Sequence, residues 1–214
     1  MRNATRGLVS TFGGFVGLMG VEHGIGGVLQ GSRPPTGLII LSWPDSAFFS
    51  ILGGEPALTI IPNLLITGLL AILVSLIFAV WAVLFVQCKH GGRVLILLSI
   101  PMLLFGAGLF PPVLGVLIGS AATRLHAPLT WWQRRLPTGL RGFLMAVWPC
   151  SFGACLAAWL GMFPGVPVLN YFFGVHDESL IFILLYCMFG CLFLTGVAGF
   201  ARDTAGREGS TSGV

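Results

Sequence analysis

Long apolar stretches separated by short polar segments dominate the chain. Five of them reach or exceed the roughly 17–25 residues that a helix needs to cross a bilayer: residues 8–29, 57–86, 94–122, 142–163 and 180–201. The first is interrupted only by Glu22 and His23, and the third is divided by Pro111 and Pro112. The pattern predicts an all-α, polytopic transmembrane helix bundle that forms a single domain over residues 1–201.

Composition excludes a water-soluble domain. Only 8% of the 214 residues are charged and 56% are hydrophobic, whereas about a quarter of the residues of a soluble domain are charged. The tail at 202–214 is rich in Gly, Ser and Thr, which predicts a disordered cytoplasmic segment.

Positive charge favours one arrangement of the spans. If residues 94–122 form a re-entrant hairpin with its tip at Phe110, Pro111 and Pro112, and residues 37–52 stay outside, ten of the eleven Lys and Arg residues are cytoplasmic. Only Arg33 is then outside. Five spans give at best seven against four, and six spans give eight against three. Because cytoplasmic segments carry the excess of Lys and Arg, we expect four full spans plus the hairpin, with both termini cytoplasmic.

Glycines recur along the first span at alternating spacings of four and three. On a helix they fall within roughly 80° of arc, which forms one stripe. Such a stripe lets a second helix approach closely, either within the chain or in a dimer. The stripe consists of Gly13, Gly17, Gly20, Gly24, Gly27 and Gly31.

Ionisable residues in the same span indicate a polar site. Glu22 points about 180° away from the glycine stripe, whereas His23 and Gln30 share one of its flanks. A carboxylate that faces lipid costs several kcal/mol, so Glu22 should face another helix or a polar cavity. Because adjacent residues do not share a helical face, we do not expect Glu22 and His23 to pair with each other.

A polar ladder is predicted on the second span. Its members are spaced by four and are Glu55, Thr59, Asn63 and Thr67. At about 1.5 Å per residue, Asn63 and His23 both lie roughly 10 Å below the outer face. We therefore expect Glu22, His23 and Asn63 to converge there near the hairpin tip. The polar members could equally act as interhelical hydrogen-bonding groups with no other role.

Other candidate sites are weaker. The cysteines of the last two spans, Cys150, Cys155, Cys187 and Cys191, lack the C-x-x-C spacing of structural metal sites. Asp177 suits the N-cap of the last helix better than a metal site. We expect no metal, no cofactor and no nucleic-acid partner.

Four short strings carry a family resemblance. The chain resembles small, uncharacterised prokaryotic polytopic membrane proteins in V-E-H-G-I-G-G-V-L-Q-G (21–31), I-I-P-N-L-L-I-T-G (60–68), K-H-G-G (89–92) and F-P-P (110–112). The resemblance implies the cytoplasmic (inner) membrane of a prokaryote and no particular activity.

Three functions fit this sequence. The first is a small carrier, channel or hydrophobic-ligand binder that uses the polar site for a proton, a small molecule or a lipid. The second is an accessory or scaffold subunit that docks on other membrane subunits. The third is a lipid-modifying enzyme with Glu22 and His23 as acid and base.

Overall fold

The predicted all-α architecture is confirmed. A computed structural model describes residues 4–127 and 136–211, with side chains as far as 205. Four helical segments are long and apolar enough to cross a membrane: residues 4–29, 64–85, 138–173 and 178–205. The helices are α1 (Ala4–Leu29), α2 (Leu64–Val80), α3 (Gly91–Leu104), α4 (Phe110–Ala122), α6 (Thr138–Leu160), α7 (Val166–Phe173) and α8 (Glu178–Thr211). π-Helical turns at Trp81–Phe85 and Gly161–Gly165 extend α2 and join α6 to α7.

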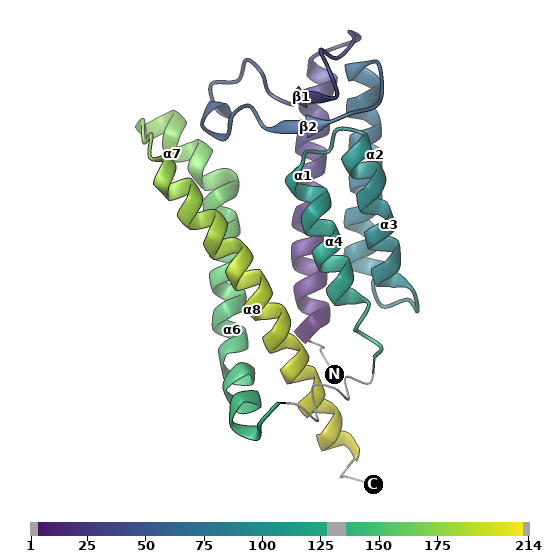
Figure 1. Cartoon of the computed structure of the whole chain (residues 1–214), viewed down its shortest axis with the longest axis vertical. Helices are drawn as coiled ribbons and strands as arrows, with labels where there is room; N and C mark the ends of the chain where they lie inside the picture. The colour runs from purple at the N-terminus through teal and green to yellow at the C-terminus, as the bar shows by residue number, and fades with distance from the viewer. Residues whose placement is uncertain (1–3, 128–135, 212–214) are drawn as a thin grey trace. The chain divides into compact units, whose positions relative to one another are not determined.

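The chain divides into two compact units, where we expected a single domain. The first unit, residues 9–123, contains most of α1 together with α2, α3 and α4. The second, residues 1–8 and 124–214, contains α6, α7, α8 and the start of α1. Within it α6 and α8 lie side by side (Figure 1). Apolar length predicts helices but not which of them pack together.

Glycines bring α1 and α2 into backbone contact in the first unit. A Cβ added at Gly17 would lie 2.8 Å from the Ser75 carbonyl oxygen, and one at Gly24 would lie 2.8 Å from the Gly68 carbonyl oxygen. Gly13, Gly20 and Gly27 meet the same helix. Gly31 does not belong to this surface, because it follows the end of α1 with φ 79° and a Cβ there would meet nothing within 4 Å. Its role is to end the helix in the left-handed conformation.

α3 and α4 form a helical hairpin, side by side in Figure 1. Gly92 near the start of α3 lies beside Thr123 at the end of α4, so the two open ends meet. The turn between them is residues 105–109, and Gly106 and Gly108 have φ of 81° and 85°. The predicted tip, Phe110, Pro111 and Pro112, is instead the first turn of α4. Proline is tolerated there because that turn needs no N–H donor, whereas the left-handed turn itself requires glycine.

The segment between α1 and α2 contains a two-stranded antiparallel sheet and no span. Strand β1 (Ile39–Leu41) pairs with β2 (Pro56–Leu58), with Ile40 opposite Ala57. Helix α2 starts only at Leu64, so Glu55, Thr59 and Asn63 do not form the predicted helical ladder. Pro62 disfavours helix at the residue before it, and Asn63 caps α2 by accepting the Ile66 N–H at 3.2 Å.

Helix α8 continues through residues 202–211, where we expected a disordered tail; residues 212–214 lie outside the described part. The first residues of this extension are held by polar contacts within the second unit. The Asp203 carboxylate accepts the N–H groups of Ala4 at 2.7 Å and Thr5 at 3.1 Å. The Arg202 guanidinium lies 5.0 Å from the centre of the Trp148 ring. These contacts order the first residues after the predicted boundary.

Candidate functional site

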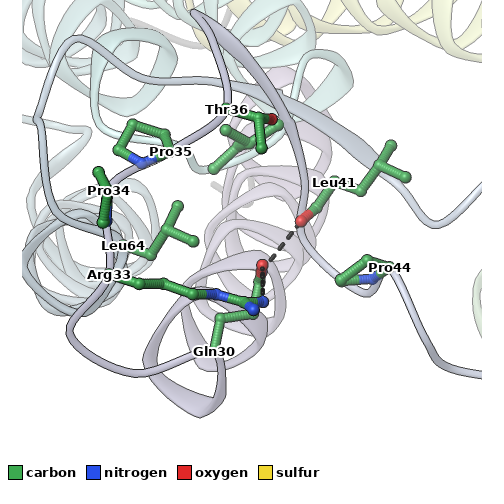
Figure 2. A pocket seen from close by; sticks show the side chains of 9 residues that line it. Gln30, Arg33, Pro34, Pro35, Thr36, Leu41, Pro44 and Leu64 are labelled. Atoms are coloured by element: carbon green, nitrogen blue, oxygen red, sulfur yellow. Dashed lines mark hydrogen bonds between the residues drawn. The ribbon is translucent and has the colours of Figure 1, made fainter.

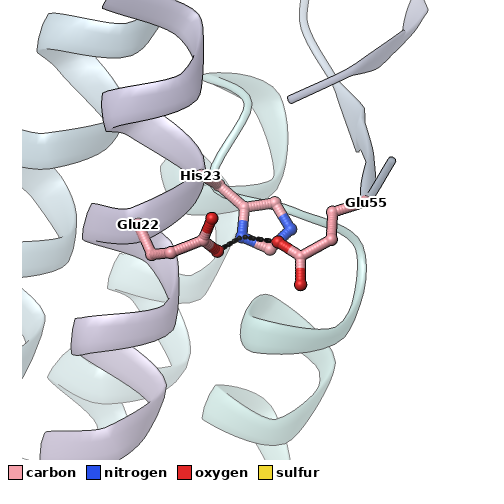
Figure 3. Close-up of side chains that lie close together, drawn as sticks. All are labelled: Glu22, His23 and Glu55. Atoms are coloured by element: carbon pink, nitrogen blue, oxygen red, sulfur yellow. Dashed lines mark ion pairs between the residues drawn. The ribbon is translucent and has the colours of Figure 1, made fainter. Parts of the chain in front are cut away.

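Two carboxylates and an imidazole meet in the first unit. His23 Nδ1 lies 3.0 Å from Glu22 Oε2 and 3.6 Å from Glu55 Oε2 (Figure 3). One possible ligand atom from each residue falls within 4.8 Å of the other two. The His23 and Glu55 side chains are 6% and 5% exposed, and Glu22 is 31% exposed. We call these three residues the Glu–His–Glu cluster.

The contact between Glu22 and His23 corrects our expectation that they would not pair. Their backbones point about 100° apart on α1, but the long Glu22 side chain reaches across to the imidazole. His23 Nδ1 also lies 3.0 Å from the Met19 carbonyl oxygen, which can only accept a hydrogen bond. Nδ1 therefore carries a proton, because an unprotonated nitrogen would face these oxygens without a donor.

Glu55 reaches the cluster from an unusual backbone conformation. Among the described residues it is the one non-glycine residue with positive φ, 54°, and it follows Gly53 and Gly54 with φ of 66° and 71°. The left-handed conformation costs about 1–2 kcal/mol for a residue with a Cβ. Ladder hydrogen bonds hold it, since Ser42 N–H donates to the Glu55 carbonyl and Trp43 N–H to the Gly54 carbonyl, both at 3.0 Å. Strain of this kind concentrates at functional sites.

The buried carboxylate of Glu55 is incompletely satisfied. Its Oε2 atom has no hydrogen-bond partner. Burial, together with the neighbouring Glu22, raises the pKa of Glu55 to about 8, although His23 opposes the shift. Glu55 lies outside the four spans, in the segment before β2. An uncompensated negative charge there is unfavourable, so a proton or another cation is stabilised at this position.

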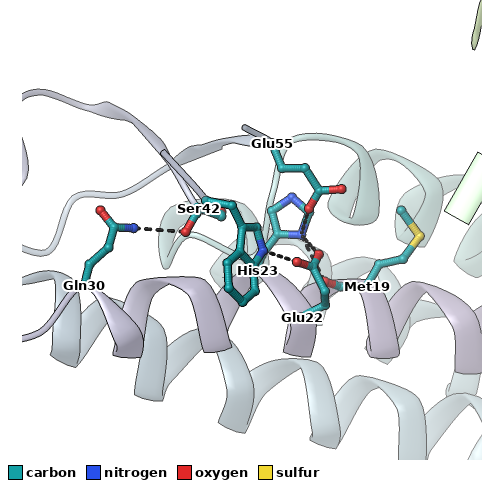
Figure 4. A network of polar contacts seen from close by, with 7 residues as sticks. Met19, Glu22, His23, Gln30, Ser42 and Glu55 are labelled. Carbon is teal, nitrogen blue, oxygen red and sulfur yellow. Dashed lines mark hydrogen bonds and ion pairs between the residues drawn. The ribbon is translucent and has the colours of Figure 1, made fainter. Parts of the chain in front are cut away.

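The loop before β2 covers Glu22. The indole N–H of Trp43 donates a hydrogen bond to Glu22 Oε1, and the indole stacks on Phe49 with ring centres 4.9 Å apart. Gln30, predicted as a site residue, directly follows α1 and donates to the Ser42 carbonyl at 3.1 Å (Figure 4). It also donates to the Leu41 carbonyl at 3.0 Å. Gln30 therefore fastens the loop to α1 and does not belong to the cluster.

The hairpin turn closes the cluster from another direction. The space where Gly108 would carry a Cβ is occupied by the His23 ring, with Nε2 the nearest atom. Glycine at 108 thus serves both the left-handed turn and the close approach of the imidazole. Hairpin and cluster are in contact as the sequence suggested, although through Gly108 and not through Phe110, Pro111 or Pro112.

The remaining predicted polar residues lie elsewhere. Thr59 and Thr67 are buried and hydrogen bond to each other at 2.9 Å. Asn63 donates to Ser32 Oγ at 2.9 Å, so the predicted convergence of Asn63 with Glu22 and His23 is wrong. The run Gly53-Gly54-Glu55-Pro56 was the missed signal, because two glycines before a proline predict a tight turn and not a helix.

A cavity lies at the C-terminal end of α1. It measures about 400 Å³, and its lining includes Gly26, Gln30, Arg33 and Trp43. A second cavity of about 250 Å³ shares Gln30 and Arg33 and is bounded by Pro34, Pro35 and Leu64 (Figure 2). Trp43 lines the larger cavity and its indole also hydrogen bonds to Glu22, so this residue contacts both the cavity and the cluster.

In the described part of the chain, the Glu–His–Glu cluster is the one group of His, Cys, Asp or Glu side chains close enough to hold a metal ion. The cysteines form no such group there. We expected no metal site because the cysteines lack C-x-x-C spacing and Asp177 suits an N-cap. Family models, curated proteins and solved structures contain no match to this chain.

Proposed function

We propose that the protein is a small membrane carrier that takes up a cation at the Glu–His–Glu cluster. The observation that carries this proposal is the buried Glu55 Oε2 atom, which accepts no hydrogen bond and lies 3.6 Å from His23 Nδ1. Among the described residues, neither Glu22 nor Glu55 forms an ion pair with a Lys or Arg side chain. Because the site combines two carboxylates with a single imidazole, an additional positive charge would be stabilised there.

The position of the cluster on α1 supports a transport role. His23 lies about six residues before the end of the helix, or roughly 9 Å along its axis. Ionisable groups within a span are costly and typically line ion pathways. The α3–α4 hairpin brings irregular backbone against His23, and such backbone is tolerated at membrane depth only where protein or a wet cavity surrounds it. In this proposal the hairpin is re-entrant, both termini are cytoplasmic, and the cluster opens outward.

Access to the cluster would pass by Glu22. It is the one cluster member with a substantially exposed side chain, at 31%. Trp43 lines the cavity of about 400 Å³ and its indole hydrogen bonds to Glu22. Movement of this indole would connect the cavity with the two carboxylates, which makes Trp43 the gate in the proposed route.

Charge movement in proteoliposomes tests the proposal. Purified protein reconstituted into liposomes should carry positive charge inward along a cation gradient, reported by a voltage-sensitive dye. Glu22→Gln and Glu55→Gln should each reduce the initial rate at least about tenfold, since each removes a charge that the cation needs. Glu178→Gln, the same change at an exposed position that begins α8, is the control and should leave the rate unchanged.

Two results would contradict the carrier proposal. One is an unaltered rate in both cluster variants. The other is an absence of charge movement in the wild-type protein together with purification only in complex with a second membrane protein. The latter result would favour an accessory subunit.

A further inference from the structure

We infer that the cation held by the Glu–His–Glu cluster is a divalent first-row transition-metal ion such as Zn²⁺, ligated by Glu22, His23 and Glu55. This inference rests on the proposed cation site and names its chemical class. It departs from our expectation from the sequence, which included no metal.

The spacing of the three side chains fits such an ion. Metal bonds of about 2.0–2.2 Å to nitrogen and oxygen place tetrahedral ligand atoms about 3.3–3.6 Å apart. His23 Nδ1 lies 3.0 Å from Glu22 Oε2 and 3.6 Å from Glu55 Oε2, which brackets that range. Small side-chain rotations would therefore complete the ligand set, with no backbone movement.

A second observation points to a ligand independently of the spacing. Glu55 is 4% exposed, and its Oε2 is directed at His23 Nδ1 while accepting no hydrogen bond. Buried carboxylate oxygens are normally satisfied by donors or by metal ions. The left-handed backbone at Glu55, held by the β1–β2 segment, directs this carboxylate toward α1.

The donor types distinguish between classes of cation. Ca²⁺ requires six to eight oxygen ligands and Mg²⁺ a nearly ideal octahedron of oxygens. An imidazole together with two carboxylates suits Zn²⁺, Mn²⁺ or Fe²⁺ better. Three protein ligands also leave a fourth position open, as in metal sites that exchange a ligand. Two carboxylates balance the charge of one divalent ion, whereas a monovalent ion would leave one negative charge uncompensated.

Metal binding requires a free lone pair on His23 Nδ1. In the described structure the Nδ1 proton faces the Met19 carbonyl and the Glu22 carboxylate. When the ion binds, this proton moves by way of solvent to Nε2, the Nδ1 lone pair forms the metal bond, and the imidazole stays neutral. The oxidation state of the metal is unchanged.

Calorimetry on the full-length protein tests the inference. Protein purified in detergent and stripped with a chelator is titrated with Zn²⁺. We expect one ion per chain. Substitution with Co²⁺ should give d–d absorption without the thiolate charge-transfer bands that cysteine ligands would produce.

Three variants locate the site. Glu22→Gln, His23→Gln and Glu55→Gly should each weaken Zn²⁺ binding by at least about tenfold, because even the outer-shell partners of metal ligands contribute that much. Glu55→Gly guards against misfolding, since glycine relieves the positive φ at this position. His126→Gln, at an exposed histidine, is the matched control and should bind like the wild type.

The outcomes separate this inference from the carrier proposal. If the wild-type protein binds no Zn²⁺, Mn²⁺ or Co²⁺ but still moves charge in liposomes, the metal inference fails and the carrier proposal stands. Zn²⁺ binding that persists in all three variants would place the ion elsewhere and would also overturn the inference. If neither binding nor charge movement occurs, both proposals fail.

Discussion

The two units use glycine in opposite ways. In the unit of residues 9–123, glycines of α1 face the α2 backbone so closely that most could not carry a methyl group. In the unit that contains α6 and α8, Gly142, Gly153, Gly190 and Gly196 have nothing within 4 Å of an added Cβ. That unit buries large side chains such as Trp159 and Met188 instead. A high glycine content is therefore not itself a sign of close helix packing.

The two units also satisfy their buried polar groups differently. In α6 and α8, Ser151 and Thr195 donate to carbonyls of their own helix at 3.0 and 2.6 Å. Such bonds need no partner from another segment. In the first unit, His23 and Glu55 are buried, ionisable and contributed by different segments. Closely packed helices hold such groups in register, and we therefore place the proposed function in the first unit.

The largest effect is expected from alanine substitutions of one glycine in each unit, which test the contrast in glycine packing. A Cβ at Gly68 would lie 2.5 Å from the Gly24 carbonyl oxygen and the Val28 nitrogen, both backbone atoms. Gly68→Ala should destabilise the protein by about 1–3 kcal/mol through overpacking. Gly153→Ala, within α6 and without neighbours, should stabilise it by about 1 kcal/mol through helix propensity. Thermal unfolding in detergent measures both, and equal shifts of the same sign would refute the contrast.

Most of the helical architecture was predictable from the sequence, whereas the boundaries at special backbone conformations were not. Apolar length located the four spans, and the balance of Lys and Arg favoured a hairpin over residues 94–122. The position of its turn was missed because Pro111 and Pro112 looked like the break, while Gly106 and Gly108 supply the left-handed residues. The start of α2 was missed because the apolar run at 57–63 continues through β2 into the helix.

Two of the three residues of the Glu–His–Glu cluster were predicted to meet, and Glu55 was named only as a member of the polar ladder. Glu22 and His23 were identified because charge within a span is costly. The participation of Glu55 depends on a strand pairing that no helical spacing reveals. Asn63 was misplaced because its N-cap role, a frequent one for Asn before an apolar helix, was not considered.

The second prediction compares two left-handed glycines. Gly108 has φ 85° and faces the His23 ring, whereas Gly174, in the other unit, has φ 65° and no neighbour within 4 Å of an added Cβ. Alanine at either position should cost about 1–2 kcal/mol in backbone strain. Gly108→Ala should in addition displace His23 and reduce cation uptake, and Gly174→Ala should leave uptake unchanged. Equal uptake by the two variants would show that the hairpin turn does not position His23.

A smaller effect is expected at the cap that the second unit provides for α1. Asp203 accepts the N–H groups of Ala4 and Thr5, two donors that the first turn of α1 leaves free. Asp203→Ala should lower the free energy of unfolding by about 1 kcal/mol, and Asp203→Asn should recover most of it. Cation uptake at the Glu–His–Glu cluster should be unaltered in both variants. A large loss of uptake in Asp203→Ala would show that the two units are functionally coupled.

The smallest effect on stability compares two tryptophans. Trp43 Nε1 donates to Glu22, whereas Trp148 Nε1 has no hydrogen-bond partner and its ring faces Arg202. Trp43→Phe keeps an aromatic ring against Phe49 but removes the donor, which should cost less than about 1 kcal/mol because the half-exposed Glu22 can bond to water instead. The same donor fixes the direction of the Glu22 carboxylate, so the variant should bind Zn²⁺ about tenfold more weakly. Trp148→Phe removes no such bond and should bind Zn²⁺ like the wild type. Calorimetric titration of the two variants decides the point, and identical affinities would mean that Trp43 covers the cluster without orienting it.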